Sequence, residues 1–295
     1  MIVYVNGTFV SEEEAKVSVF DHGFLYGDGV FEGIKAYNGR IFALDEHVDR
    51  IYESAQSIQL ELPLSRSEMK QAIIETVRRN NLRDAYIRPV ASRGKGALGL
   101  DPRSCKKATV VIIVDAEIRH PEDTGGTSLS QKGIKVISST FRRNGPDVLS
   151  PRVKSTNYLN NILAKLQANA VGVQDAIFLN GQGFVCELTG DNLFIVKNSR
   201  VITPPLWFGI LDGITRRVVL RIAAEMGLEV AEDPLTLHDV YTSDECFCTA
   251  TRIEVAPIVW VDGRQIGSGT PGSVTTKITK KLLELARREG TPIYE

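Results

Sequence analysis

Lys154 is the residue whose setting first suggests chemistry. It stands in RVKSTNYLNN (152–161), after Pro151 and before an apolar helical pattern. An amine on an ordered element near the positive N-terminal end of a helix is suited to forming a Schiff base with an aldehyde. Lys165, on the flank of the same pattern, has the ordinary setting of a solvated lysine. Taken alone, Lys154 also has this more common explanation, so the chemical interpretation depends on other residues.

Two features farther along the chain would complete a site for a pyridine aldehyde that carries a phosphate. Glu187 in CELTGDNLF (186–194) is a carboxylate beside a glycine turn, and it could face a ring nitrogen. The run LDGITR (211–216) opens an amphipathic helix, whose N–H groups and threonine hydroxyl could bind a phosphate. Each feature alone is also typical of a solvated turn or an ordinary helix start. Together with the lysine, they are what such a cofactor requires.

The spacing of ELTGDNLF, VIT (201–203) and LDGITR resembles the signature of the class IV (fold type IV) aminotransferases, which use pyridoxal phosphate. The resemblance covers essentially the whole chain, and within class IV the chain resembles the branched-chain amino acid aminotransferases. It implies an α+β fold with two domains, a small N-terminal α/β domain and a larger strand-rich domain that carries the lysine. Further matching segments are YGDGVFEGIKAYNG, EHVDRIYESA, AYIRPV, RVKSTNYLNN and DECFCTATRIE.

For the cofactor, the resemblance implies a role for each matching residue. Lys154 would bind the aldehyde and, once released by the substrate amine, would move a proton from the substrate Cα. Glu187 would face the pyridine nitrogen, and Tyr158 would hydrogen-bond the phenolic oxygen. The phosphate would be bound by Arg50, by the helix start at Gly213, Ile214 and Thr215, and by the Thr251 hydroxyl.

For the substrate, the resemblance implies an apolar pocket with a polar group at its mouth. Tyr26, Phe31 and Gly33 match residues that form the side-chain pocket. Tyr86 and Arg88 match a neighbouring strand that helps to hold carboxylates, and a pocket that also takes glutamate needs such a cation. Packing of aromatic residues in a core is the alternative explanation for Tyr26 and Phe31.

The chain departs from the family pattern directly after Thr251. Arg252 and Ile253 stand where two small residues usually offer their N–H groups to the substrate carboxylate. The expected reaction is transfer of the amino group of L-leucine, L-isoleucine or L-valine to 2-oxoglutarate, giving branched 2-oxo acids and L-glutamate. Transamination of D-amino acids or (R)-amines, release of aminobenzoate by a lyase, and binding of the cofactor without turnover stay open.

A different cofactor is suggested by GKGALG (94–99), which matches GxGxxG after a predicted strand, with Asp115 about 20 residues on. A dinucleotide site requires the third glycine to open a crossover helix that holds the pyrophosphate. Only LDPRSCKK separates Gly99 from the next predicted strand, which is too short for a crossover of about a dozen residues. We therefore predict a glycine-rich hairpin loop, and a nicotinamide-dependent dehydrogenase is the less favoured function.

The elements that must position these residues begin with strands. IVYVNGTFV (2–10) is typical of a β-hairpin, and apolar residues with a 3.6-residue period predict helices at 44–58 and 65–79. Strands are predicted at 85–93 and 108–118. This pattern indicates an α+β unit in which the helices are grouped after the first strands.

A stretch rich in proline, glycine, serine and threonine follows, as is typical of a linker. We expect a domain at 1–120, a linker at 121–132, and a second domain at 133–295 that carries the lysine. In the second domain, strands are predicted at 134–143, 175–180, 192–197, 200–205, 244–250 and 257–266, and helices at 158–170, 214–228 and 274–288. The expected inner face of the first of these helices is Leu159, Ile162, Leu163, Leu166 and Ala170.

The composition indicates a globular protein that acts on small molecules. Lys and Arg number 35 against 36 Asp and Glu, so there is no electrostatic footprint for nucleic acid or anionic lipid. The longest apolar stretch, ATVVIIV, is shorter than the roughly 20 residues of a membrane helix. The four cysteines are too few for a disulfide framework, and no second pair or nearby histidine completes a metal site with Cys246 and Cys248.

These features lead to expectations about cell biology as well as chemistry. The N-terminus lacks the basic region of a signal peptide, so we expect a cytoplasmic protein with reduced thiols and no bound metal. The expected partners are amino acids and 2-oxo acids. The family resemblance adds a homodimer or a larger homo-oligomer.

Overall fold

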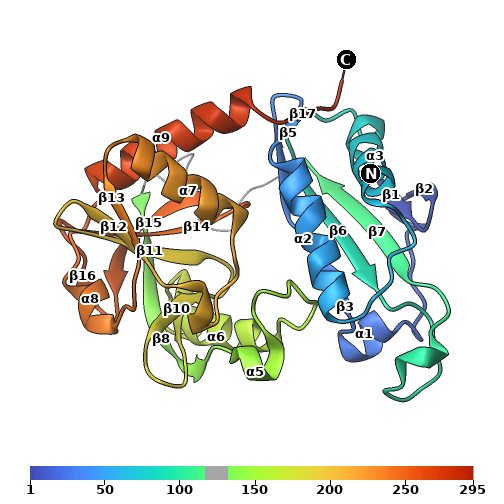
Figure 1. The fold of residues 1–295 in the computed structure, drawn as a ribbon, viewed down its shortest axis with the longest axis horizontal. Helices are drawn as coiled ribbons and strands as arrows, with labels where there is room; N and C mark the ends of the chain where they lie inside the picture. The colour runs from blue at the N-terminus through green and yellow to red at the C-terminus, as the bar shows by residue number, and fades with distance from the viewer. Residues whose placement is uncertain (117–131, 295) are drawn as a thin grey trace. The chain divides into compact units, whose positions relative to one another are not determined.

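The computed structural model describes residues 1–116 and 132–294 of the chain (Figure 1). The chain forms two compact units, each built on its own sheet. The linker expected at 121–132 lies outside the described residues, except for Lys132. Unit 1 consists of Met1–Ile118, Val153–Asn157 and Ala286–Glu295, and unit 2 consists of Arg119–Arg152 and Tyr158–Leu285.

Two short segments of the expected second domain belong to unit 1. Val153–Asn157, which includes Lys154, joins unit 1 because its backbone pairs there: Phe31 N donates to Lys154 O at 2.9 Å, and Thr156 N donates to Gly29 O at 2.9 Å. The end of the chain joins it because β17 (Thr291–Pro292) pairs with β5 (Arg40–Ile41). The chain therefore crosses between the units more often than a single linker would allow.

Unit 1 is built on an eight-stranded sheet with the order β17-β5-β4-β6-β7-β1-β2, in which β3 also pairs with β6. The pairings that form it are antiparallel. The predicted N-terminal hairpin is confirmed as β1 and β2. The other strands of this sheet are β3 (Gly29–Phe31), β4 (Ile34–Tyr37), β6 (Ala85–Ser92) and β7 (Thr109–Asp115), after β1 (Ile2–Val5) and β2 (Thr8–Ser11).

Two of the predicted helices cover this sheet. The helix α2 (Leu44–Ser57) runs in front of the sheet in Figure 1, and α3 (Arg66–Arg79) begins with a capping box formed by Ser65 and Glu68. Their apolar faces and the inner face of the sheet form one buried core. The remaining helical segments of this part are α1 (His22–Tyr26) and the 3-10 turn η1 (Pro102–Ser104).

The glycine run at 94–99 lies in the connection between β6 and β7, which pair antiparallel as predicted. Asp21 and Lys95 form an isolated bridge, and His22 Nε2 lies 2.9 Å from Ala97 O, so this loop packs beside α1. All residues of this connection are described, and η1 is the helical segment within it. A crossover helix does not follow Gly99, which removes the structural basis for a dinucleotide site.

Unit 2 is built on a nine-stranded mixed sheet with the order β10-β9-β8-β15-β14-β11-β12-β13, in which β16 pairs with β15. The pairs β8–β9, β15–β8 and β12–β13 are parallel. Its strands are β8 (Ile134–Arg142), β9 (Asp175–Leu179), β10 (Val185–Leu188), β11 (Asn192–Lys197), β12 (Arg200–Thr203), β13 (Glu229–Glu232), β14 (Glu245–Ala250), β15 (Glu254–Val261) and β16 (Arg264–Gln265).

The helices of unit 2 pack on this sheet in two places. Apolar residues of α7 (Ile214–Glu225) and α9 (Ser273–Arg288) form one core with strands that include β11 and β14. The helix α6 (Leu159–Ala170) packs on β8 and β9. Within the described residues, none of the helices is long and apolar enough to cross a membrane. The shorter segments are α5 (Pro146–Leu149), η2 (Leu206–Phe208) and α8 (Leu237–Tyr241).

The predicted inner face of α6 is wrong. The helix forms where the 3.6-residue period placed it, but its buried residues are Asn161, Ala164 and Ala168. Small side chains allow the helix to approach the sheet closely, and the Asn161 amide donates to Thr189 O at 2.7 Å. The expected stripe of Leu159, Ile162, Leu163, Leu166 and Ala170 faces outward instead.

Candidate active site

Lys154 is held in unit 1 through its main chain. Its N–H donates to Ser54 Oγ at 3.1 Å, and its carbonyl accepts from Phe31 N. Its Nζ lies 4.7 Å from the centroid of the Phe31 ring. Because α2 and β3 fix the backbone on both sides, the side chain of Lys154 starts from an ordered point. Lys165, the lysine chosen for comparison, is half-buried in unit 2 and donates to Gln174 O, so it is not the fully solvated residue expected.

Phe31, Tyr86 and Arg88 form a cluster on one face of the unit 1 sheet. Tyr86 and Arg88 are two positions apart on β6, next to β3, so their side chains share a face. Arg88 Nη2 donates to the Tyr86 hydroxyl at 2.7 Å, and the Arg88 Cζ lies 4.7 Å from the Phe31 ring centroid. Gly33 is required here, because a Cβ on it would lie 2.2 Å from the Tyr86 hydroxyl oxygen.

Arg88 has a donor that is not satisfied by the protein. Its Nε is buried and has no hydrogen-bond partner within the described residues. A buried guanidinium N–H without an acceptor is costly, and a carboxylate is the acceptor whose shape matches the guanidinium fork. The cluster therefore fits a ligand with an apolar side chain and a carboxylate.

Tyr26 lies with the glycine loop. Its hydroxyl accepts from Gly99 N at 2.8 Å, and its ring meets the edge of His22 at a centroid distance of 5.0 Å. Its side chain is partly exposed. The structure thus ties Tyr26 to the loop at 94–99, and its role toward a substrate stays a prediction.

Arg50 belongs to a buried polar cluster that the sequence analysis did not identify. Its Nε and Nη2 donate to the two oxygens of Glu32 at 2.6 and 2.8 Å, and His47 Nδ1 lies 2.8 Å from Glu32 Oε2. Burial alone raises the pKa of Glu32, but Arg50 and His47 outweigh this and hold that pKa well below its usual range. The available signal was the spacing of His47 and Arg50 on the apolar face of a predicted helix.

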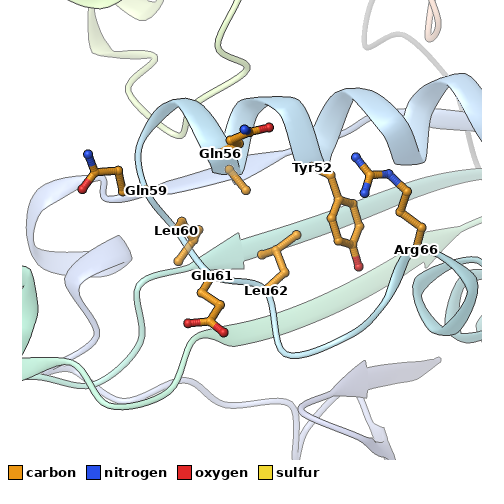
Figure 2. Close-up of a pocket in the computed structure, with 8 residues that line it drawn as sticks. Tyr52, Gln56, Gln59, Leu60, Glu61, Leu62 and Arg66 are labelled. Atoms are coloured by element: carbon orange, nitrogen blue, oxygen red, sulfur yellow. The ribbon is translucent and has the colours of Figure 1, made fainter.

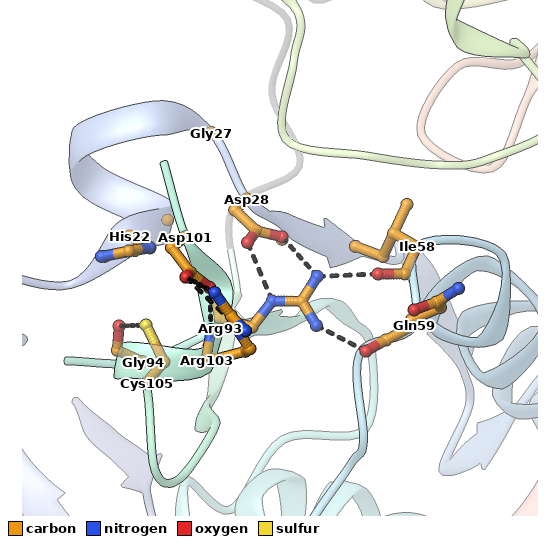
Figure 3. Close-up of polar contacts among 12 residues, drawn as sticks. His22, Gly27, Asp28, Ile58, Gln59, Arg93, Gly94, Asp101, Arg103 and Cys105 are labelled. Atoms are coloured by element: carbon orange, nitrogen blue, oxygen red, sulfur yellow. Dashed lines mark hydrogen bonds and ion pairs between the residues drawn. The ribbon is translucent and has the colours of Figure 1, made fainter. Parts of the chain in front are cut away.

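A second arginine connects α2 to the strand that carries Phe31. Arg93 Nε and Nη2 donate to the Asp28 carboxylate at 2.8 and 2.9 Å, and its guanidinium also donates to Ile58 O and Gln59 O at the C-terminal end of α2 (Figure 3). A guanidinium there satisfies carbonyls that lack helical partners. Arg93 therefore fixes the end of α2 against the segment that leads into β3.

Glu187 is buried in unit 2 and is surrounded by donors. Arg143 Nε and Nη2 each lie 2.8 Å from Oε1, and both Asn192 Nδ2 and Leu211 N donate to Oε2 at 3.0 Å. Asn192 also donates to Leu211 O at 2.9 Å. Arg143 and Asn192 were not identified from the sequence, although Asn192 lies within ELTGDNLF.

The start of α7 offers a second polar feature in unit 2. Gly213 is the N-cap of this twelve-residue helix and has no side chain with which to cap it, and Ile214 and Thr215 are buried. A Cβ on Gly213 would lie 2.0 Å from Asn192 Oδ1, so only glycine fits without displacing the Glu187 network. A buried helix start with its N–H groups directed outward suits a phosphate dianion.

The remaining predicted residues of unit 2 have definite places. Tyr158 is the N-cap residue of α6 and is half-buried. Thr251, Arg252 and Ile253 form the turn between β14 and β15, where Arg252 is exposed and Ile253 packs against the core. The Oγ1 of Thr249, two residues earlier, is buried without a partner in the described chain.

The residues chosen from the sequence thus form two groups. Unit 1 carries Tyr26, Phe31, Gly33, Arg50, Tyr86, Arg88 and Lys154, and unit 2 carries Tyr158, Glu187, Gly213, Ile214, Thr215, Thr251, Arg252 and Ile253. No group of three or more His, Cys, Asp and Glu side chains that could hold a metal is found within 1–116 and 132–294. The donors present suit an organic anion instead.

A pocket of about 450 Å³ lies beside the C-terminal half of α2, and none of these residues lines it (Figure 2). In the close-up, Tyr52 and Arg66 lie at one end, and Leu60 and Leu62 lie on the segment that runs below α2 in this view. Tyr52 donates to Leu64 O and Arg66 stacks over its ring, so both groups are already satisfied by the protein. Its full lining is Tyr52, Ala55, Gln56, Gln59, Leu60, Glu61, Leu62 and Arg66.

Residues 29–261 match the family model of the class IV aminotransferases, so the chain belongs to that family. The match contains Lys154, Glu187 and the cluster of Phe31, Tyr86 and Arg88. As in the family, the cofactor is pyridoxal phosphate: a branched-chain amino acid aminotransferase of Thermobaculum terrenum, solved in its PLP-form, has a TM-score of 0.89 and 31% identity, covering 100% of this chain and 98% of that one.

Relatives agree along the full length. The chain is 52% identical over all of both sequences to a protein of Methanocaldococcus jannaschii named "Putative branched-chain-amino-acid aminotransferase". It is 38% identical to the branched-chain-amino-acid aminotransferase of Pseudomonas aeruginosa, over 96% of this chain and 92% of that protein. The structure also resembles a branched-chain aminotransferase of Thermoproteus uzoniensis solved with norvaline, with a TM-score of 0.91 and 37% identity over 100% and 99% of the two chains.

Proposed function

We propose that the chain is a branched-chain amino acid aminotransferase, which transfers the amino group of L-leucine, L-isoleucine or L-valine to 2-oxoglutarate. The observation that carries this proposal is the cluster of Phe31, Tyr86 and Arg88. An aromatic ring beside a guanidinium with an unsatisfied donor serves both an apolar side chain and a second carboxylate. The names of the relatives from Methanocaldococcus jannaschii and Pseudomonas aeruginosa support the same substrates.

Bound pyridoxal phosphate would supply an electron sink and a carrier for the amino group. Lys154 would hold the aldehyde of this group when no amino acid is bound, and its amine, once released, would take the proton from the substrate Cα. The main-chain bonds of Lys154 to Ser54 and Phe31 support this role, because they fix the point from which the amine moves. Such an anchored start reduces the freedom that is lost when the amine reaches the reacting atom.

Further residues would hold the rest of the cofactor in this proposal. The Glu187 carboxylate would face the ring nitrogen, and Tyr158 would hydrogen-bond the phenolic oxygen. The start of α7 and the residues Arg50 and Thr251 would donate hydrogen bonds to the phosphate. What supports this assignment is the uncapped helix start at Gly213 and the buried, fully hydrogen-bonded setting of Glu187.

The substrate binds through two kinds of contact. The side chain of the amino acid packs on Phe31 and on the space beside Gly33, where a larger residue would collide with Tyr86. The distal carboxylate of glutamate or 2-oxoglutarate bonds to Arg88 at its free Nε. The turn at Arg252 and Ile253 meets the other carboxylate in this proposal.

The decisive test is a half-reaction panel followed by absorbance. The purified protein loaded with pyridoxal phosphate is mixed separately with L-leucine, L-glutamate and their D-forms, and conversion of the bound aldehyde to the amine is recorded. We expect conversion with the two L-amino acids only. Conversion with the D-forms alone would reassign the chain to a D-amino acid transaminase, and a spectrum that no amino acid changes would indicate binding without turnover.

The lysine assignment is tested with a matched pair of variants. Lys154→Ala is expected to lose the aldehyde absorbance on dialysis, whereas Lys165→Ala keeps it, because only Lys154 is expected to bond covalently to the cofactor. Retention of the absorbance in dialysed Lys154→Ala would contradict the assignment.

We also propose that the protein is a homodimer or a larger homo-oligomer in the cytoplasm. The supporting feature is the outward stripe on α6, where Leu159, Ile162 and Leu166 are each more than half exposed. Large apolar side chains contiguous on one face of a helix are typical of a surface that another chain covers. The proposed location in the cytoplasm, where thiols stay reduced, is supported by the four cysteines, which are free.

A further inference from the structure

The carboxylate of Glu32 is the most deeply buried acid in the described part of unit 1, and the proposed reaction does not use it. It lies between Phe31 and Gly33, and its exposed fraction is 0%. Successive side chains of an extended segment point to opposite sides. Phe31 therefore faces Arg88, while Glu32 points across the chain to α2, where it meets Arg50.

One face of α2 carries the partners of this carboxylate. His47 and Arg50 are three residues apart on the helix and both contact Glu32, and Gly33 N donates to Oε2 at 3.3 Å. Ser54, one turn farther along the same face, accepts from Lys154 N. A single helix face therefore carries the residue that anchors the lysine segment and the arginine assigned to the phosphate.

Stability alone is a poor explanation for the pair of Glu32 and Arg50. Two buried charges gain little net stability over apolar side chains of similar volume, because both lose their hydration. What the pair does that apolar residues cannot do is orient a planar group. Nε and Nη2 of Arg50 meet the two oxygens of one carboxylate, and this fork fixes the plane of the guanidinium and the direction of its Nη1 edge.

We propose that Glu32 is a positioning residue for the cofactor phosphate: it holds Arg50 in the orientation in which the guanidinium meets the phosphate, and His47 holds Glu32 in turn. This inference rests on the proposed role of Arg50. All three residues of the FEG segment then have a proposed role: Phe31 and Gly33 toward the substrate, and Glu32 toward the cofactor phosphate.

Glu32 could affect phosphate binding in two ways, through its own negative charge or through the orientation that it gives to Arg50, and these two effects are opposite. If Glu32 acted only through its charge, Glu32→Gln would tighten binding, because a negative charge near a dianion would be gone. If it acts by orientation, Glu32→Gln weakens binding, because an amide cannot accept both guanidinium bonds. The two explanations therefore predict opposite changes in phosphate binding for Glu32→Gln.

The experiment measures dissociation constants of pyridoxal phosphate and of pyridoxal, which lacks the phosphate, for the full-length apoprotein. We expect Glu32→Gln to weaken pyridoxal phosphate binding by about tenfold to a hundredfold and to leave pyridoxal binding within about twofold. Glu46→Gln, on the exposed face of the same helix, is the control and should change neither. Tighter or unchanged binding of pyridoxal phosphate to Glu32→Gln, or equal weakening of both ligands, would overturn the inference.

A second comparison covers the case in which Glu32→Gln does not fold. Arg50→Met and the double variant Glu32→Gln/Arg50→Met bury no unpaired guanidinium at this place. The double variant should bind pyridoxal phosphate as tightly as Arg50→Met or more tightly, because without Arg50 only the charge of Glu32 is left to act; a weaker double variant would contradict this. If the unaltered protein binds pyridoxal and pyridoxal phosphate equally well, the phosphate role of Arg50 itself fails, which separates that failure from a failure of the inference.

Discussion

Arg143 and Glu187 form a buried ion pair in unit 2, in which Nε and Nη2 of the guanidinium both lie 2.8 Å from the same carboxylate oxygen. Their side chains are 8% and 6% exposed. The other oxygen of Glu187 accepts from Asn192 and from Leu211 N. The carboxylate assigned to the ring nitrogen is thus fixed in the protein by three partners before any ligand is considered.

Removing Arg143 should destabilise the protein strongly. Arg143→Met leaves the Glu187 carboxylate buried without its cation, and we expect the free energy of unfolding to fall by about 3–5 kcal/mol. Arg142→Met, at the exposed neighbouring position, should change it by less than about 0.5 kcal/mol. Urea unfolding of the two apoproteins measures both. Equal midpoints for the two variants would show that the pair contributes no more than a surface charge.

Gly213→Ala should damage the site without straining the backbone. Gly213 has a φ of −68°, which alanine adopts freely, but the added methyl would lie 2.0 Å from Asn192 Oδ1. Asn192 would have to move and lose its bond to Glu187, at a cost of about 1–3 kcal/mol in unfolding free energy. Gly181→Ala, where nothing lies within 4 Å, is the matched control. A thermal unfolding scan that ranks the two variants equally would contradict the steric argument.

His47 should make stability depend on pH. Burial lowers the pKa of His47 from its ordinary 6.5, while Glu32 raises it and Arg50 and Lys154 lower it further. The unfolded chain therefore binds the proton first, so this contribution is complete above pH 6.5 and is lost as the pH falls toward the lower folded value. Urea unfolding from about pH 7.5 down to about pH 5.5 should show this decline.

The variant His47→Gln should flatten that decline, because it removes the titrating group. His238→Gln, at an exposed histidine, serves as the control and should leave the pH dependence unchanged. A slope that stays the same in His47→Gln would assign the pH dependence to another group.

Arg252 should influence the choice of acceptor. It places an exposed cation on the turn proposed to meet a substrate carboxylate, so Arg252→Ala should weaken the use of 2-oxoglutarate through a KM raised by about twofold to fivefold, the range of an exposed ion pair. The value of kcat should stay the same. Steady-state kinetics with Arg264→Ala, another exposed arginine of unit 2, provides the comparison. An effect on kcat alone would argue against a contact with the ground-state substrate.

The stripe on α6 predicts a change in oligomeric state. Ile162→Glu places a charge in the middle of the exposed apolar face, so it should shift the protein toward the monomer in sedimentation velocity. Asn169→Glu, at an exposed polar position of the same helix, should leave the distribution unchanged. A monomer for the unaltered protein would contradict the proposed assembly directly.

Sequence periodicity predicted the elements better than their faces. The helices α2, α3 and α7 formed at the expected positions with their apolar residues inside, because they pack on broad apolar surfaces. In α6 the period was equally clear, yet the leucines and Ile162 face outward and alanines face the sheet. A repeat of apolar residues indicates that a helix has two different faces, but it does not say which face packs on the sheet. Where the helix approaches the sheet closely, the face with the smaller side chains can be the buried one.

The candidate site shows a similar limit. Residues with distinctive chemistry in a known pattern, such as Lys154 and Glu187, could be chosen from the sequence. Glu32, His47 and Arg143 could not, because each is an ordinary charged residue until the fold supplies its partner from another element. The sequence also contained no local sign that Val153–Asn157 would pair with β3, since such pairing depends on segments more than 100 residues apart.

The return of Val153–Asn157 to unit 1 has a consequence for how the protein can assemble. A nascent chain that ends before residue 153 contains α2 and β3 but lacks the segment that bonds to them, and β17, which pairs with β5, is made later still. Contacts across such long sequence separations form late and slowly. The amine proposed to bond to the cofactor is therefore put in place only after residues 1–153 have been made, so a chain released before that point would lack it altogether.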